Sequence, residues 1–241
     1  MLAIKTTNLT KKYKDKLAVD NLNLEIKQGQ LFCLLGVNGA GKSTTIKMLS
    51  CLLTPTKGDA LLLDRSIKKK PLKVKQIINV SPQETAIAPN LTVYENLEFI
   101  AEIYGFDKKE AKEKASEMIT KFGLTDVEKQ KADILSGGMQ RRLSIAMALI
   151  SDPKILFLDE PTLGLDVIAR RELWKIIESL KEKMTIILTT HYMEEAEALS
   201  DEIGIMVKGK LVEVGTSKEL MKKTKTKNFE DAFVSLASEV I

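Results

Sequence analysis

A glycine-rich segment, Gly36-Val-Asn-Gly-Ala-Gly-Lys-Ser43, constrains the fold of this chain more than any other feature. It follows the apolar run 31–35, which predicts a buried strand, and it precedes residues 42 to about 53, which predict a helix. With this spacing, successive backbone N–H groups converge on a phosphate and the helix presents its positive end to that phosphate. The sequence therefore predicts a strand–loop–helix unit that binds a nucleotide.

Two side chains at the end of this loop suit phosphate chemistry. Lys42 supplies a positive charge for the β- and γ-phosphates, and Ser43 offers its hydroxyl to Mg²⁺. A chance glycine-rich turn would not have an apolar strand before it and a helix-forming stretch after it. The residues of this segment that we expect to bind the nucleotide are Gly36, Asn38, Gly39, Ala40, Gly41, Lys42, Ser43 and Thr44.

The composition is that of an ordinary globular chain. Its 241 residues are 44% hydrophobic and 29% charged, which suits one α/β core with an insertion. The net charge of +4 is too small to indicate nucleic acid as a partner. The basic runs 68–75 and 222–227 are expected to be solvated surface, with anionic lipid as the weaker alternative. Cys33 and Cys51 are expected to remain reduced core residues.

No part of the sequence predicts a membrane span. A spanning helix needs about 18–20 consecutive apolar residues, and no stretch of this chain approaches that length. The N-terminus also lacks the apolar core of a signal peptide. We therefore expect a cytosolic location.

Hydrophobic periodicity predicts a mainly parallel sheet that is interrupted once by helices. Alternation at Leu22, Leu24 and Ile26 predicts a strand with one buried face. From Thr92 to about residue 150 the pattern becomes helical, with one capping box at Thr92 and another at Thr125. Further strands are expected at 59–64, 77–80, 155–158, 185–189, 203–207 and 211–214.

Two carboxylates follow the apolar run 155–158. Ligands bind at the carboxyl ends of strands in open α/β sheets, so Asp159 is positioned to hold Mg²⁺. Glu160 would then face the water that attacks the γ-phosphate and act as its general base. On their own, both residues fit a solvated loop better than a catalytic site. The phosphate-binding loop elsewhere in the chain favours catalysis.

A second glycine-rich segment, Leu135-Ser-Gly-Gly138, precedes a stretch with apolar residues at helical spacing. Ser136 and the amides of Gly137 and Gly138 would form another helix N-terminus able to contact an anion. A plain serine cap with a glycine turn explains the same residues as well. If the segment does bind phosphate, the nucleotide of another chain is the expected ligand, because the first loop already surrounds the chain's own nucleotide.

Together these three segments resemble the ATP-binding-cassette ATPases, in which they occur in this order. The resemblance covers nearly the whole chain and implies a P-loop NTPase of the α/β class. It implies a RecA-like core with an antiparallel β subdomain, an inserted α-helical subdomain, and a head-to-tail dimer that encloses two ATP molecules. We expect one domain over 1–241, divided into a core and β subdomain at about 1–88 and 151–215, a helical subdomain at about 89–150, and a helical tail at about 216–241.

Other positions match motifs of that family and receive their roles from the resemblance alone. Tyr13 falls where an aromatic ring stacks on adenine, although a plain strand tyrosine is also credible. Gln83 matches the glutamine that contacts Mg²⁺ and water. His191 matches the residue that contacts the γ-phosphate. The segment that would cross the dimer interface consists of Gly164, Leu165 and Asp166.

The resemblance extends to one branch of the family. Met139 replaces the usual glutamine of the signature, and Cys51 stands where glycine is frequent; neither change removes a catalytic group. Met139 and the segments 160–166 and 191–195 are typical of ATPase subunits of ABC-2 type exporters. We therefore expect a second nucleotide-binding subunit, identical or a close paralogue, and a separate membrane permease that contacts the chain near residues 83–104. The chain would lie on the cytoplasmic face of the membrane.

Three alternatives remain open. An importer subunit has the same motifs, although the short stretch after Gly215 favours an exporter over subunits with an added regulatory domain. A cassette that acts on nucleic acid or ribosomes would carry long coiled coils or a second cassette, and the sequence predicts neither. A P-loop kinase would have no use for the second glycine-rich segment.

Overall fold

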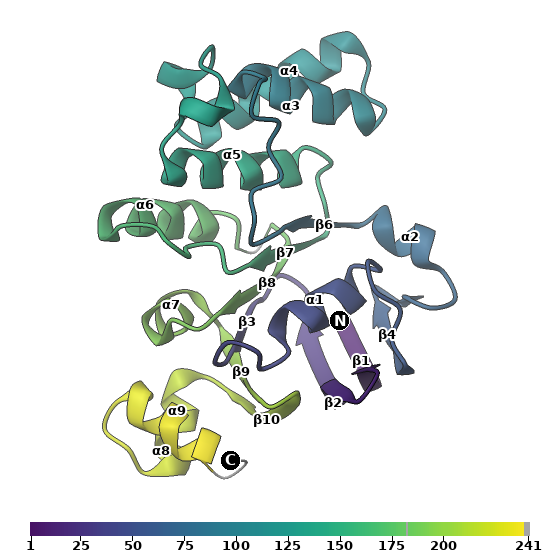
Figure 1. Ribbon diagram of the computed structural model, residues 1–241, viewed down its shortest axis with the longest axis vertical. Helices are drawn as coiled ribbons and strands as arrows, with labels where there is room; N and C mark the ends of the chain where they lie inside the picture. Colours follow the sequence, from purple (N-terminus) through teal and green to yellow (C-terminus); the bar gives the residue numbers. More distant parts are fainter. Residues whose placement is uncertain (182, 239–241) are drawn as a thin grey trace.

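Two β-sheets and the helices around them make up the fold (Figure 1). The computed structural model describes residues 1–181 and 183–238. The larger sheet has the order β10-β9-β3-β8-β7-β6, and its pairings are parallel except for that of β10 with β9. Its strands are β3 (Leu31–Leu35), β6 (Ile78–Ser81), β7 (Ile155–Asp159), β8 (Thr185–Thr190), β9 (Glu202–Val207) and β10 (Lys210–Gly215).

The apolar runs read from the sequence are the central strands of this sheet. Every residue of β3, β7 and β8 is buried, as expected for parallel strands that are covered on both faces. Alternate side chains of β3 enter two hydrophobic cores, Cys33 on one face and Phe32 and Leu34 on the other. Burial also raises the pKa of the Cys33 thiol, which makes it an unreactive core residue.

A smaller antiparallel sheet with the order β2-β1-β4-β5 lies beside the first. The alternation that predicted a half-buried strand is confirmed, because Leu22, Leu24 and Ile26 are buried while Asn23 and Glu25 are exposed. The strands of this sheet are β1 (Leu2–Tyr13), β2 (Lys16–Lys27), β4 (Lys57–Leu62) and β5 (Arg65–Ser66). Helix α1 (Lys42–Leu49) begins directly after the glycine-rich loop, between the two sheets in the view of Figure 1.

A group of helices lies at one end of the molecule, beyond β6 (Figure 1). The expected capping box is present at Thr92, whose hydroxyl accepts from the Glu95 amide while the Glu95 carboxylate accepts from the Thr92 amide. A further capping box at Asp107 was not predicted from the sequence. The helices here are α3 (Val93–Ile103), α4 (Lys108–Lys121) and α5 (Gly137–Leu149), with short 3₁₀ turns η1 (Thr125–Val127) and η2 (Ala132–Ile134).

The remaining helices lie outside this group. They are α2 (Pro71–Lys75), α6 (Val167–Glu178), α7 (Met193–Leu199), α8 (Ser217–Thr224) and α9 (Phe229–Ser238). The expected turn at 208–210 joins β9 and β10 as an antiparallel pair. Helices α8 and α9 occupy the predicted tail, whose residues 239–241 lie outside the described part of the chain. Among the described residues, no helix is both long enough and apolar enough to cross a bilayer.

Two local predictions are wrong. The helix after the glycine-rich loop ends at Leu49 rather than near residue 53, because Cys51 takes a left-handed conformation with φ 58°. This conformation favours glycine, which explains why glycine is frequent there. Thr125 does not cap a helix, since it lies inside the 3₁₀ turn and its carbonyl accepts from the Glu128 amide.

The two threonines provide a matched test of helix capping. Thr92→Ala should lower the free energy of unfolding by about 1 kcal/mol, because it removes the acceptor for an end N–H of α3. Thr125→Ala should change it by less than about 0.5 kcal/mol, because the Thr125 hydroxyl has no such role. Urea titrations of both variants measure the difference, and equal losses would contradict the assignment of the cap.

Candidate functional site

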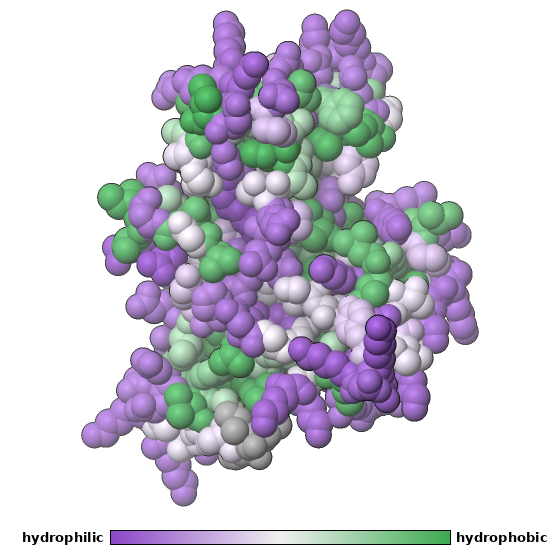
Figure 2. All heavy atoms as spheres, viewed as in Figure 1, coloured by the Kyte–Doolittle hydropathy of each residue, from purple (hydrophilic) through white to green (hydrophobic). Residues whose placement is uncertain are grey.

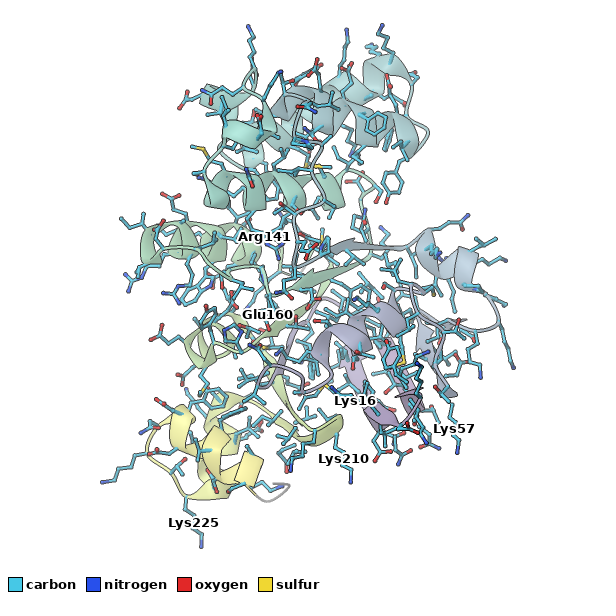
Figure 3. The ribbon with its side chains drawn as sticks, viewed as in Figure 1. Lys16, Lys57, Arg141, Glu160, Lys210 and Lys225 are labelled. Carbon is cyan, nitrogen blue, oxygen red and sulfur yellow. The ribbon has the colours of Figure 1, made fainter. Side chains whose placement is uncertain are left out.

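A cavity of about 430 Å³ lies around the glycine-rich loop. It collects residues that are far apart in the sequence, because the ends of β3, β7 and β8 lie at one edge of the larger sheet. The sequence-predicted residues that line it are Tyr13, Asn38, Gly39, Ala40, Gly41, Lys42, Ser43, Thr44, Gln83, Glu160 and His191. The labelled side chain of Glu160 lies near the centre of the molecule in Figure 3.

Two glycines of the loop lie too close to neighbouring backbone for any other residue. Gly41 has φ 108°, and a Cβ there would lie 2.5 Å from the Ala18 carbonyl oxygen. A Cβ on Gly36 would lie 2.4 Å from the carbonyl oxygen of Met206. The loop is therefore seated against β2 and β9, which fixes its amides at the start of α1.

The charged groups of the site meet at Glu160. The Lys42 ammonium lies 3.1 Å from one Glu160 carboxylate oxygen, and Nδ1 of His191 lies 2.8 Å from the other. Both Lys42 and Glu160 are almost fully buried, at 5% and 6% exposed. Lys42 also donates to the Gly36 carbonyl at 2.7 Å. Burying two charges is costly unless each has close polar partners, and here both Lys42 and Glu160 have them.

Backbone conformation directs the Glu160 side chain into the cavity. Its φ is 48°, a left-handed value that non-glycine residues seldom adopt. The Glu160 amide donates to both the carbonyl and the hydroxyl oxygens of Thr189, each at 3.1 Å. These two bonds to β8 hold the conformation against its intrinsic cost.

Asp159 lies beside Glu160 and receives two hydroxyl donors. The Ser43 hydroxyl lies 3.0 Å and the Thr189 hydroxyl 2.5 Å from the same carboxylate oxygen. Carboxylate and hydroxyl oxygens are suitable ligands for a hard cation such as Mg²⁺. This ion usually keeps several water and phosphate ligands and needs only one or two ligands from the protein. Among the described residues, no group of three or more His, Cys, Asp or Glu side chains able to hold a metal occurs.

The second glycine-rich segment is not among the residues that line this cavity. The Ser136 hydroxyl caps α5 by accepting from the Met139 amide at 3.3 Å. A Cβ on Gly137 would meet no atom within 4 Å, so this helix end is open on the outside. Gly164, Leu165 and Asp166 also lie outside the cavity lining; Asp166 caps α6 through the amides of Ile168 and Ala169.

One buried residue beside the site was missed from the sequence. The guanidinium of Arg141 on α5 donates to the carbonyls of Asp159 and Pro161, which flank Glu160, at 2.8 Å each. It also donates to the carbonyls of Pro82 and Gln83. Arg141 thus joins α5 to two loops, the one after β7 that contains Glu160 and the one after β6 that contains Gln83. Figure 3 labels Arg141 directly above Glu160. Burial lowers its pKa to about 10, so it stays protonated at neutral pH.

A second buried group that the sequence did not indicate is Glu195 on α7. One carboxylate oxygen accepts from the indole of Trp174 at 3.1 Å, and the side chain is fully buried. Burial raises the pKa of Glu195, and it has no cationic partner among the described ion pairs. Glu195 lies in the segment 191–195, but nothing in that segment indicated that its carboxylate would be buried.

Comparison with known proteins identifies the family. The family model described as "ABC transporter" matches residues 19–163. The chain is 44% identical over 218 residues to the probable multidrug ABC transporter ATP-binding protein YbhF of Escherichia coli, covering 90% of this chain and 38% of that protein. It is 42% identical to the linearmycin resistance ATP-binding protein LnrL of Bacillus subtilis, covering 90% and 70%.

Solved structures agree with this result. An ATP-binding subunit of an ABC transporter matches with a TM-score of 0.84 at 25% identity, covering 97% of this chain and 99% of that one. A dimeric cassette described as a post-hydrolysis state with ADP and Pi, MJ0796, matches with a TM-score of 0.80 at 27% identity, covering 88% and 98%.

The fold and the cavity thus define a P-loop ATPase of the α/β class, and this class binds ATP. The chain belongs to the ABC transporter family. It corresponds to an ATP-binding cassette, and it spans about 38% of the length of YbhF.

The role of Arg141 can be separated from general stability with a neighbouring control. Arg141→Lys keeps the charge but leaves at least one buried carbonyl without a hydrogen-bond donor. The free energy of unfolding should therefore fall by about 1–3 kcal/mol. ATP turnover should fall further than nucleotide affinity, because the loops beside Glu160 lose their support. Arg142→Lys, which alters only a partly exposed pair with Glu172, should change either quantity little. Equal effects of the two changes would contradict this account.

Proposed function

We propose that this chain hydrolyses ATP as one subunit of a dimer and powers a separate membrane permease, of the ABC-2 exporter type. The observation that carries the proposal is the position of the Glu160 carboxylate, between Lys42 and His191 at the wall of the cavity. A protein that bound a nucleotide without hydrolysing it would need only the loop amides and Lys42. A buried carboxylate with a strained backbone beside them supports hydrolysis.

Each residue of the cavity has a distinct role in this proposal. The loop amides and Lys42 bind the phosphates, and Tyr13 covers the base from the open side, where it is 44% exposed. Glu160 takes a proton from the attacking water, and Gln83 and His191 orient that water and the γ-phosphate. Ser43, Gln83 and Asp159 would hold Mg²⁺, which neutralises charge on the phosphates when bound.

The dimer supplies the part that the cavity of one chain lacks. Ser136, Gly137 and Gly138 lie at the start of α5 and do not line the cavity of their own chain. Among the described residues, a Cβ on Gly137 would meet no atom within 4 Å, whereas a Cβ on Gly138 would lie 3.0 Å from the Ala169 side chain. In a head-to-tail pair this end would meet the γ-phosphate bound by the partner. Gly164, Leu165 and Asp166 would lie at the same interface. The dimeric form described for MJ0796 supports this arrangement.

The permease surface is proposed near residues 83–104. This region exposes Phe99, Ile103 and Tyr104 at 51%, 61% and 46%, which is unusual for large apolar side chains on one short helix. The exporter direction is supported by one relative named as a probable multidrug ABC transporter ATP-binding protein and another named as a linearmycin resistance ATP-binding protein. A permease partner places the chain at the cytoplasmic face of the membrane, and nucleic acid has no part in this proposal.

Glu160→Gln tests the general base. It keeps the size of the side chain but removes its basicity, so ATP turnover should fall about 10²–10⁴-fold while nucleotide still binds. The variant should also accumulate as an ATP-bound dimer in size-exclusion chromatography. Glu194→Gln, which removes an exposed carboxylate on α7, should leave turnover unchanged. A normal rate in Glu160→Gln would exclude Glu160 as the base.

A mixing experiment tests the composite site. Ser136→Arg blocks the helix end and Lys42→Ala weakens phosphate binding, so each variant alone should be inactive. In a mixed dimer, the loop of the Ser136→Arg chain meets the intact helix end of the Lys42→Ala chain. An equimolar mixture should recover about a quarter of wild-type turnover, because half of the dimers are mixed and each has one intact site. No recovery in dimers shown to be mixed would refute action across the interface.

A further inference from the structure

A surface around α2 has a charge pattern that the proposed hydrolysis does not use. Between Asp64 and Glu84 the sequence contains six basic residues and no acidic one. One of them, Arg65, donates to the Lys73 carbonyl at 2.9 Å and so holds α2 against β5. The other five form what we call the lysine patch: Lys68, Lys69, Lys70, Lys73 and Lys75.

The lysine patch is exposed and lacks counter-ions. All five side chains are exposed, and none forms an ion pair within the described part of the chain. The nearby Asp59 carboxylate is already bound by the Ser66 hydroxyl at 2.6 Å. The uninterrupted run of basic residues makes a local excess of positive charge, and such an excess favours an anionic partner.

The same surface also carries an apolar element. Leu72, the second residue of α2, is 75% exposed, whereas Val74 two residues later is fully buried and anchors the helix. Leu72 borders a cavity of about 400 Å³ whose apolar lining includes Met48 and Leu53, with Lys68 and Lys75 also in its wall. Figure 2 shows this region, labelled α2 in Figure 1, as hydrophilic with a small hydrophobic tip.

These features favour an anionic lipid membrane over nucleic acid as the partner of the lysine patch. Proteins that read nucleic acid usually add arginine forks to their positive charge, and the one arginine of this region, Arg65, instead donates to the Lys73 carbonyl. A lipid surface needs only positive charges near its phosphates and an apolar side chain that enters the acyl boundary. An exposed leucine among lysines suits the lipid surface.

We propose that the lysine patch and Leu72 bind the headgroups of an anionic lipid membrane. Lys75 also lines a second cavity, together with Tyr104 and Phe106. Because Tyr104 belongs to the surface proposed for the permease, the lysine patch adjoins that surface. A chain seated on a permease through that surface would therefore carry the patch next to the membrane. The lysines bind lipid phosphates as point charges, and Leu72 inserts between the headgroups. This contact is independent of ATP hydrolysis.

Vesicle co-sedimentation of the full chain tests the proposal. Vesicles of phosphatidylcholine mixed with phosphatidylglycerol should bind the chain, and vesicles of phosphatidylcholine alone should not. Replacing Lys68, Lys69 and Lys70 with Gln should weaken binding by on the order of 100-fold, at about fivefold for each lysine. Removing the same charge from the other basic run, with Lys222→Gln, Lys225→Gln and Lys227→Gln, should have little effect. Leu72→Ser should weaken vesicle binding without changing the charge.

Several outcomes would overturn the proposal. One is equal loss of vesicle binding from the two lysine triplets, which would indicate a general charge effect. Another is full competition by inorganic phosphate at the concentration of lipid phosphate, which would indicate recognition of single phosphates. Tighter binding to duplex DNA, lost in the same variant, would make the patch a nucleic-acid surface. Unchanged thermal unfolding and ATP turnover of the variants without vesicles confirm that they are folded.

Discussion

The fold of this cassette is organised around one buried ion pair, between the ammonium of Lys42 and the carboxylate of Glu160. Buried charges are stable only with close partners, so the loop before α1 and the end of β7 must stay in contact. The parallel order β3-β8-β7 achieves this by ending three strands at one edge of the sheet. His191, directly after β8, completes the contact from the third strand.

The helical end of the molecule is tied to this point by hydrogen bonds rather than by charge pairing. Arg141 reaches from α5 to backbone carbonyls on both sides of Glu160 and to those at Pro82 and Gln83. A movement of α5 would therefore shift both loops together. This gives the cassette a direct physical connection between the helix that begins at Ser136 and the proposed base.

The sequence predicted features that depend on local pattern and missed those that depend on backbone partners. Runs of apolar residues identified the buried strands, and Thr92 was recognised as a cap. Thr125 showed the same pattern but lies within a 3₁₀ turn, because tertiary context decides whether a helix follows. Arg141 was missed because its partners are carbonyl groups, which every residue has and which leave no mark in a sequence. The site assignments themselves remain predictions.

The pairing of Lys42 with Glu160 has a consequence for the timing of catalysis. The Lys42 ammonium lies 3.1 Å from one oxygen of the Glu160 carboxylate, so that oxygen is occupied by an ion pair within the chain. A polyphosphate that draws Lys42 toward its own oxygens removes that charge and leaves Glu160 with His191 alone. One oxygen of the proposed base then becomes available to water only after the substrate has arrived. In this proposal the substrate itself uncovers the group that activates the attacking water.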